Sequence, residues 1–483
     1  MVAGGDPGVA GSATAQEHWS SRFAFVMAAV GSAVGLGNLW RFPAEAGQNG
    51  GGAFVIFYIA CVALIGLPLL LSETLIGRHG KSSAVESVRV VARESGGSTA
   101  WSALAVVGAI ASFLIVSFYS VIAGWVLYYI GVFAGDLFAS IGSGNLTGGA
   151  FAGQSAEQVQ GLMPALFDNN AVMLPLHALF MGLTIYVVAR GVTGGIEKVA
   201  VYLMPAFFIL FLGITVYGAF SGDFAEALAF MFAFDPARLL HGPVMLSALG
   251  QAFFSLSLGS AIMITYGAYA DRGVNLAKTS GMIAACDTSV AIIAGLCIFP
   301  IVFAAGLAVD SGPTLMFQTL PASFQTMPAG SLIGLLFFVM VFFAALTSSV
   351  SLLDAPTNWI RYKFGWTRAR TAVLVGGLAF VIGIFSALSF NVMGEWYPLD
   401  FIAMFREQNF FGVVDGFTGK IMLPLSGLLT AIFIGWVADR RLTDAENGIS
   451  GGLHLFWRFL VAWLCPIALT VILILGIFPE LIG

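Results

Sequence analysis

Charged side chains are scarce in this sequence. Lysine, arginine, aspartate and glutamate account for 9% of its 483 residues, whereas apolar residues account for 59% and the mean hydropathy is +0.94. This composition excludes a soluble protein of this length and indicates an all-α membrane protein whose helices cross a lipid bilayer many times. The sequence also lacks a run of basic residues, so we expect no nucleic-acid partner.

Cysteine is rare, and signals of secretion are missing. The four cysteines lie in separate apolar segments without the spacing of a metal site, so we expect buried thiols rather than disulfides. The start of the chain is rich in glycine, alanine and serine, with neither a basic region nor a short apolar core. We therefore expect a flexible tail rather than a cleaved signal peptide.

Long apolar segments predict eleven membrane spans. We expect these spans at residues 23–48, 52–77, 101–133, 170–189, 197–220, 244–270, 279–308, 331–361, 369–389, 410–438 and 453–478. Basic residues follow spans 2, 4, 6, 8 and 10, whereas the segment 134–169 contains no lysine or arginine. The positive-inside rule therefore predicts a cytoplasmic N-terminus and an external C-terminus in the inner (plasma) membrane of the cell.

Two spans are interrupted by residues that do not suit a continuous apolar helix. Span 1 contains three glycines, an asparagine and an arginine within Gly31–Arg41, and span 6 contains three serines and a glutamine within Gln251–Ser260. The hydrocarbon of the bilayer offers no hydrogen-bond partners to the backbone amides and carbonyls that a helix break leaves unpaired, so such a break has to line a cavity. In that cavity the amides suit a carboxylate and the carbonyls suit a small cation. The alternative is a slim packing face formed by Gly31 and Gly35, which leaves the asparagine and the arginine unexplained.

The two interrupted spans begin two consecutive blocks of five spans. Paired broken helices at corresponding positions indicate an inverted-repeat transporter with its site near the middle of the membrane. We expect a flexible cytoplasmic tail at 1–21, a first repeat with its external loops at 22–243, an inverted second repeat at 244–438, and a last span with a short external end at 439–483.

Five segments together resemble the neurotransmitter:sodium symporter family. They are Trp19–Arg22, Gly31–Pro43, Asn49–Phe54, Gln251–Gly259 and Ala345–Ser349. The resemblance extends over nearly the whole chain from Trp19 and fits the bacterial amino-acid transporters with eleven spans. It implies two inverted five-helix repeats with unwound first and sixth helices.

The resemblance implies two sodium sites made of oxygen ligands. The first site would use the carbonyl of Ala33, the side chains of Asn38, Ser255 and Asp287, and the carboxylate of the substrate. The second site would use the carbonyls of Gly31, Val34 and Ala344 with the hydroxyls of Thr347 and Ser348. Small hard cations prefer such oxygens. Taken alone, these hydroxyls also fit hydrogen bonds within their own helix or to a neighbouring helix.

The resemblance also implies roles for residues around a substrate. Tyr119 would donate its hydroxyl to the substrate carboxylate, Phe254 would cover the pocket, and Arg41 with Asp415 would form the charge pair that closes above it. Gly35 stands where amine-selective members carry an aspartate, so the substrate has to supply its own carboxylate, as an α-amino acid does. The substrate site would comprise Ala33, Gly35, Gly37, Ile115, Tyr119, Phe254, Ser255, Ser257, Gly259, Ser260, Ser348 and Leu352. Ser260 replaces a large aromatic residue of some relatives, so we expect a bulky hydrophobic neutral amino acid.

Two carboxylates remain in the apolar interior. Glu73 matches a residue that ties down the unwound part of span 6 in the family, which is a structural role. Asp287 stands where most relatives have asparagine and obtain a negative charge from a nearby acid or from bound chloride. Ala291 replaces that acid or the chloride-binding serine, so we expect transport that is independent of chloride. Alternatively, Asp287 is protonated and serves as a neutral substitute for asparagine.

The inner gate departs from the family pattern. The usual arginine before the tryptophan and the usual aspartate at the end of span 8 are replaced by Gln16 and Tyr362. Inner closure therefore has to use other contacts, for which Trp19 and Tyr269 are candidates.

These features predict a sodium-coupled symporter of neutral α-amino acids that works by alternating access. A proton-coupled or exchanging carrier on the same fold would lack the hydroxyls of Thr347 and Ser348, which are present. A channel, or a receptor that binds the amino acid without transporting it, stays an alternative. The sequence shows no nucleophile–base pair or metal cluster near the broken helices, which argues against an enzyme.

Overall fold

The computed structural model describes residues 17–233, 241–310, 312–478 and 481, and these residues form helices without any β-strand. Most of the expected N-terminal tail, including Gln16, lies outside the described residues. Among those that are described, nine helical stretches are long and apolar enough to cross a membrane. Each fits one of the spans that the sequence predicts.

The nine stretches combine α-helices with short π- and 3-10-helical turns (η). In chain order they are α3 (Gly52–Cys61) with η2 (Val62–Gly66) and α4 (Leu67–Gly80); η3 (Thr99–Ser102) with α6 (Ala103–Gly142); α9 (Asn170–Ala189); η4 (Val192–Ile196) with α10 (Glu197–Ser221); α15 (Leu276–Ala304); α17 (Gly330–Phe364); α18 (Arg368–Leu388); α19 (Phe410–Gly416) with η8 (Phe417–Met422), α20 (Leu423–Ile432) and η9 (Phe433–Val437); and α22 (Gly451–Phe459) with η10 (Leu460–Leu464) and α23 (Cys465–Ile477).

Two further spans are broken. The first consists of α1 (Arg22–Ala33), followed by η1 (Gly37–Arg41) and α2 (Phe42–Gln48), with a bend of 45° at the break. The second consists of α13 (Gly242–Ser255) and α14 (Ile262–Ala268). In the described residues the first of these bent pairs brings the helices that can cross a membrane to ten, and α13 with α14 occupies the segment predicted as span 6. Both breaks lie inside the two segments that the sequence singles out.

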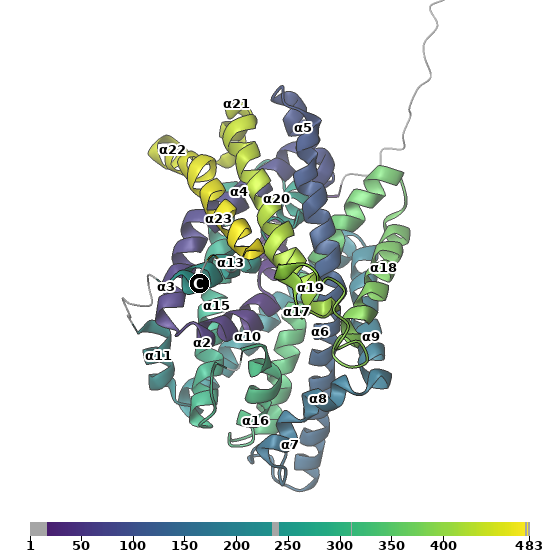
Figure 1. Cartoon of the computed structure of the whole chain (residues 1–483), viewed down its shortest axis with the longest axis vertical. Helices are drawn as coiled ribbons and strands as arrows, with labels where there is room; N and C mark the ends of the chain where they lie inside the picture. The colour runs from purple at the N-terminus through teal and green to yellow at the C-terminus, as the bar shows by residue number, and fades with distance from the viewer. Residues whose placement is uncertain (1–16, 234–240, 311, 479–480, 482–483) are drawn as a thin grey trace, which may run out of the picture.

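Short helices cover the two ends of the bundle. These are α5 (Ala84–Glu94), α7 (Ala156–Gln160), α8 (Leu162–Phe167), α11 (Phe224–Phe232), α16 (Leu320–Ser323) and α21 (Arg440–Asn447). Figure 1 shows α5 and α21 at one end of the molecule and α7 and α16 at the opposite end. The long axis of the helix bundle therefore runs between these two groups of short helices.

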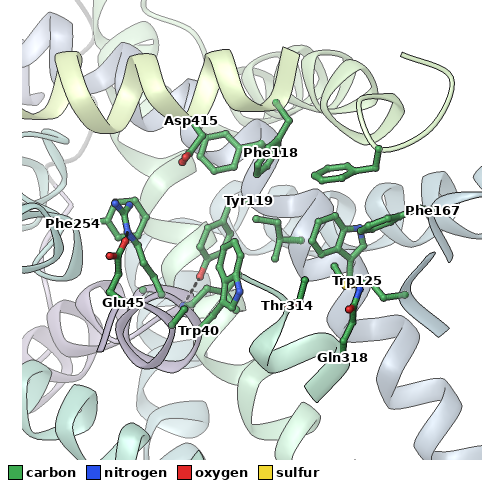
Figure 2. A pocket seen from close by; sticks show the side chains of 18 of the residues that line it. Trp40, Glu45, Phe118, Tyr119, Trp125, Phe167, Phe254, Thr314, Gln318 and Asp415 are labelled. Carbon is green, nitrogen blue, oxygen red and sulfur yellow. Dashed lines mark hydrogen bonds and ion pairs between the residues drawn. The ribbon is translucent and has the colours of Figure 1, made fainter. Parts of the chain in front are cut away.

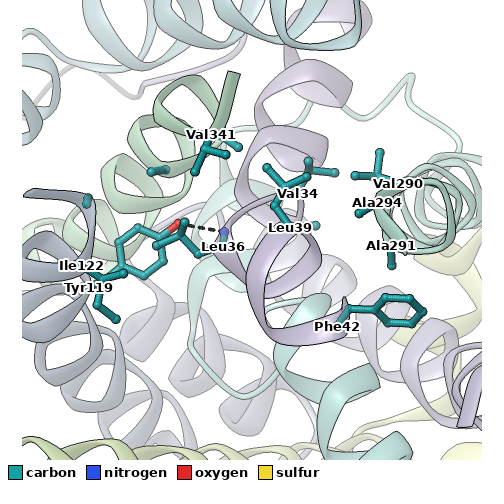
Figure 3. Close-up of a cluster of buried hydrophobic side chains, with 14 of the residues drawn as sticks. Val34, Leu36, Leu39, Phe42, Tyr119, Ile122, Val290, Ala291, Ala294 and Val341 are labelled. Atoms are coloured by element: carbon teal, nitrogen blue, oxygen red, sulfur yellow. Dashed lines mark hydrogen bonds between the residues drawn. The ribbon is translucent and has the colours of Figure 1, made fainter. Parts of the chain in front are cut away.

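The broken first helix lies in the middle of the molecule. Figure 3 shows Val34, Leu36 and Leu39 between the side chains of α6 on one side and those of α15 on the other. All three side chains are buried. Apolar packing therefore fixes the helix on both sides of its break, and the break itself is enclosed by protein as the low polarity of a membrane requires.

The turn between α17 and α18 is defined by local backbone signals. Gly365 ends α17 in the left-handed region (φ 66°), which glycine adopts without steric cost. The hydroxyl of Thr367 then accepts a hydrogen bond from the amide of Arg370 (3.4 Å) and caps the start of α18. This tight turn returns the chain beside α17, so that Arg368 lies next to the end of the preceding helix.

Candidate functional site

The break in the first span exposes backbone groups to side chains from elsewhere in the fold. Val34 is extended (ψ 101°), and the helix resumes only at Gly37. The amide of Gly35 donates to the side-chain oxygen of Asn38 (3.1 Å), and the amide of Leu36 donates to the hydroxyl of Tyr119 (3.3 Å). The Tyr119 hydroxyl thus lies beside two amides that form no helical hydrogen bond, and a carboxylate would bind at such amides.

The break in the sixth span is held by strained backbone and by two neighbouring helices. Ser257 (φ 54°) and Ala261 (φ 61°) adopt left-handed conformations that non-glycine residues rarely take. The amide of Gly259 donates to the Glu73 carboxylate (2.8 Å), and the hydroxyl of Ser112 donates to the carbonyl of Ser260 (2.5 Å). Glu73 therefore lies where a carboxylate that ties down this segment is expected.

The residues expected to bind the first sodium ion come together from three helices. Asn38 donates its amide to the Asp287 carboxylate (2.8 Å) and to the Ser255 hydroxyl (3.0 Å). Ser255 also donates to both carboxylate oxygens of Asp287, at 2.9 and 2.8 Å. Tyr58 adds a third donor to this carboxylate (3.2 Å). The cluster is fully enclosed, since Asn38 and Asp287 have no exposed surface.

The residues expected to bind the second sodium ion also converge. The hydroxyl of Ser348 lies 3.1 Å from the carbonyl oxygen of Gly31 and 3.3 Å from that of Val34. The hydroxyl of Thr347, one residue earlier on α17, lies 3.0 Å from the carbonyl oxygen of Ala344. The Ser348 hydroxyl thus links α17 to the carbonyls of the first span, whereas the Thr347 hydroxyl bonds within its own helix. Carbonyl and hydroxyl oxygens of this kind suit a hard monovalent cation.

A small cavity of about 40 Å³ lies at the break of the first span, beside Ser348 of the second cluster. Of the residues expected at the substrate, it is lined by Ala33, Gly35, Gly37, Ile115, Tyr119, Phe254, Ser257, Ser260, Ser348 and Leu352. Ser255 lies instead in the Asp287 cluster, and Gly259 is bound to Glu73. A Cβ atom on Gly35 would lie 3.0 Å from the Tyr119 hydroxyl and closer still to that of Ser348. Even the smallest side chain at this position would therefore obstruct the cavity.

A larger cavity of about 370 Å³ opens beyond Phe254 (Figure 2). Aromatic side chains dominate its walls, and Arg41, Glu45 and Asp415 supply charge. The guanidinium of Arg41 lies 4.7 Å from the centre of the Phe254 ring and pairs with Glu45 (3.7 Å). In the described part of the chain, no ion pair joins Arg41 to Asp415, although both line this cavity. The charge pair expected at the outer gate is therefore open here.

Two acidic residues at these sites do not follow from the motifs. Glu45 accepts a hydrogen bond from the Ser247 hydroxyl (2.6 Å) and pairs with Arg41 four positions earlier, a helical spacing that was the available sequence signal. Asp354 is a third fully buried carboxylate, in addition to Glu73 and Asp287. The sequence does carry a signal for Asp354, because it lies well inside the predicted span 331–361. The interpretation that only two carboxylates remain in the apolar interior is therefore wrong.

Comparison with known proteins identifies the family. A family model described as the sodium:neurotransmitter symporter family matches residues 16–137 and 157–480. The chain belongs to this family. The chain is 35% identical to the sodium-dependent transporter YhdH of Bacillus subtilis (strain 168) over 476 residues, and the match covers 96% of this chain and 97% of that protein. It is 25% identical to sodium-dependent nutrient amino acid transporter 1 of Drosophila melanogaster, across 95% of this chain and 77% of that protein.

A solved structure matches the chain over almost its whole length. The crystal structure of MhsT in complex with L-phenylalanine has a TM-score of 0.84 at 38% sequence identity, and the match covers 95% of this chain and 99% of MhsT. The fold is therefore the inverted five-helix repeat with unwound first and sixth helices. The protein is a sodium-dependent, multi-pass membrane transporter of a small molecule, and it is not an enzyme.

Proposed function

We propose that the protein is a sodium-coupled symporter of neutral, bulky hydrophobic α-amino acids that works by alternating access. The observation that carries this proposal is the position of Gly35 beside the Leu36 amide, which lies outside the helical hydrogen bonds and donates to the Tyr119 hydroxyl. The site offers donors for a carboxylate and has no room for an acidic side chain that would bind an amine. An α-amino acid supplies the missing carboxylate itself.

The names of two similar proteins support this class of substrate. MhsT was solved with L-phenylalanine, and the Drosophila relative is named as a nutrient amino acid transporter. In this chain, Ser257 and Ser260, with small side chains, line the cavity together with the apolar residues Ile115 and Leu352. Small and apolar side chains of this kind suit a large apolar side chain on the substrate, around which the cavity of about 40 Å³ would widen.

The two oxygen clusters support binding of two sodium ions. At the first cluster the ion would replace the hydrogen bonds that Asn38 and Ser255 now donate to Asp287, and the Asn38 amide would turn its oxygen inward. Two sodium ions that enter down a tenfold gradient and about 100 mV release roughly 7 kcal/mol. This energy is sufficient to concentrate an amino acid by about five orders of magnitude.

The proposed orientation follows the distribution of basic residues. It places the end with α5 and α21 in the cytoplasm and the end with α7 and α16 outside, in the plasma membrane of a cell. The large cavity beyond Phe254 then faces outward. In this arrangement residues 22–243 and 244–438 form the two repeats, and the C-terminus is external.

Uptake into proteoliposomes tests the proposal. We expect labelled L-phenylalanine to accumulate when sodium is outside and potassium inside, and not when potassium replaces the sodium. The double variant Thr347→Ala/Ser348→Ala removes two oxygen ligands, so we expect sodium-driven uptake to fall at least about a hundredfold while the protein still inserts. Unchanged sodium activation in this variant would rule out the second sodium site, and binding without accumulation would indicate a receptor.

A further inference from the structure

A second large cavity adjoins the small cavity at the break of the first span. Its volume is about 310 Å³, and most of its wall comes from α13, from the span formed by α19, η8 and α20, and from α23. Apolar side chains on these helices, among them Leu246, Phe253, Ile472 and Leu475, supply much of its lining. We call this space the side cavity, to distinguish it from the aromatic cavity of about 370 Å³ beyond Phe254.

Among the described residues, two line both the small cavity and the side cavity. They are Phe254 and Leu423. Phe254 also borders the aromatic cavity, whereas Leu423 does not. Leu423 is therefore the residue that separates the small cavity from the side cavity alone. It is absent from the residues that the motifs assign to the substrate.

The local sequence places Leu423 in this wall. It is the first residue of α20, directly after the π-helical turn η8 and before Pro424. Proline has no amide to bond the carbonyl four positions earlier, so it tolerates the wider turn that precedes it, and such turns are frequent at functional sites. Leu423 is 3% exposed, so its side chain is enclosed between the two cavities.

Two glycines allow α20 to approach the broken sixth span closely. A Cβ atom on Gly259, in the unwound segment, would lie 2.3 Å from the carbonyl oxygen of Leu423. A Cβ atom on Gly427, farther along α20, would lie 2.2 Å from the ring of Phe253. Only glycine permits both approaches. Leu423 therefore lies beside the unwound segment and reaches the same small cavity as Ser260, the residue after Gly259.

We propose that Leu423 limits the length of the substrate side chain by closing the small cavity toward the side cavity. This role rests on the amino-acid substrate proposed above. The substrate carboxylate would lie at the Leu36 amide and the Tyr119 hydroxyl, which fixes one end of the molecule. The side chain of the substrate then extends past Ser260 until it meets Leu423. A longer side chain has space only behind Leu423, in the side cavity.

A specificity role and a mere packing role of Leu423 predict different results. If Leu423 only packs, its truncation leaves a void that weakens the binding of every amino acid alike. If Leu423 limits length, the same truncation weakens the binding of an amino acid that fits the small cavity and strengthens the binding of a longer one. Apolar pockets discriminate by about 10–200-fold for a difference of one methylene group, so the second effect is measurable.

Binding of two amino acids of different length tests this role in the purified protein with sodium. The probes are L-phenylalanine and L-biphenylalanine, which carries a second phenyl ring, and the readout is the concentration that gives half of the maximal rise in Tm. We expect wild type to bind L-phenylalanine at least about a hundredfold more tightly than L-biphenylalanine. Leu423→Ala should bind L-biphenylalanine at least about tenfold more tightly than wild type and L-phenylalanine more weakly. Leu423→Val removes less of the side chain, so it should give a smaller gain and preserve the fold if alanine does not.

Ile472 provides the matched control, because it is buried and lines the side cavity but not the small cavity. Ile472→Ala removes as many atoms as Leu423→Ala, yet it leaves the wall in place, so it should not improve binding of L-biphenylalanine. Adding Ile472→Phe to Leu423→Ala refills the side cavity and should cancel the gain.

The outcomes separate this role from the proposed function. A wild type that does not respond to L-phenylalanine in sodium would contradict the amino-acid substrate itself. If wild type responds, three results would each overturn the role of Leu423: wild type that binds both amino acids equally, no gain for L-biphenylalanine in Leu423→Ala and Leu423→Val, or a gain that persists after Ile472→Phe is added.

Discussion

Asp287 is the residue that we propose compensates the positive charge of a bound sodium ion. In the proposed function, two bound sodium ions would repel each other, and the carboxylate of an amino-acid substrate would neutralise only one of their charges. Tyr58 and Ser255 both donate their hydroxyls to the Asp287 carboxylate, at 3.2 and 2.8 Å. In the proposed function, an ionised Asp287 would occupy the hydroxyl donors that a bound chloride would otherwise use.

We expect wild-type uptake to be the same in chloride and in gluconate. Asp287→Asn removes the negative charge and should raise the sodium concentration for half-maximal uptake at least about tenfold, because an uncompensated buried charge costs several kcal/mol. Adding Ala291→Ser to this variant should restore part of the uptake, but only with chloride present. The measurement is initial uptake against sodium concentration in both salts. A wild type that already needs chloride would show that Asp287 does not supply the charge.

At the scale of helices, the sequence predicts the spans and both breaks but not all of their ends. Glycine, asparagine and serine stand out in apolar segments, and α1 and α13 end inside the two segments that contain them. The third span, by contrast, extends to Gly142 rather than to residue 133. No strong stop signal precedes Gly142, and the loop beyond it contains short helices that are too brief for a periodic pattern.

The contacts between helices are the part that the sequence does not predict. Glu17 and Arg368 lie 351 positions apart and share no local motif, so only the folded arrangement shows that they pair. Arg41 differs, because its partner in this open structure is Glu45, only four positions later, whereas its expected distant partner Asp415 stays apart. Local patterns specify where helices form and break, whereas long-range pairing of single charges depends on packing.

The short helix α21 provides an example of such pairing at the end with α5. Glu446 on α21 forms an ion pair with Arg78 at the end of α4 (2.6 Å), and Arg78 also donates to the carbonyl of Val274. Hydrogen bonding from His79, together with the charge of Arg78, lowers the pKa of Glu446 from 4.5 to about 2. The carboxylate is thus charged at neutral pH. Its contribution to stability is present above pH 4.5 and is lost as the pH falls toward 2.

We expect Glu446→Gln to destabilise the protein by about 1–3 kcal/mol at pH 7, because it leaves a largely buried arginine without its charged partner. Thermal unfolding of the purified protein measures this change. Glu94 bonds the same histidine but is 49% exposed, so Glu94→Gln serves as a control with a smaller effect. The affinity for the amino acid should stay unchanged in both variants. Equal stability of Glu446→Gln and wild type at pH 7 would contradict this role.

At the scale of the whole molecule, the two ends of the transport path differ. Glu17 pairs with two arginines and Trp19 is buried, so the end with α5 and α21 is closed. At the other end, Arg41 and Asp415 stay apart and a cavity of about 370 Å³ leads toward Phe254. This combination is an outward-open conformation in the proposed orientation. The pocket that the substrate has to fill is thus accessible from one side only.

Because sodium and substrate bind only the folded protein, their binding should be visible as a gain in thermal stability. At a hundredfold excess over Kd, a ligand stabilises the folded state by about 2.7 kcal/mol, which raises Tm by a few degrees. We expect this rise for L-phenylalanine in sodium and not in potassium, because the substrate carboxylate and the first sodium ion bind each other. L-Phenylalaninamide and phenethylamine match its size but lack the carboxylate, so neither should raise Tm in either salt. An equal rise with phenethylamine would show that the donors at Leu36 and Tyr119 do not select a carboxylate.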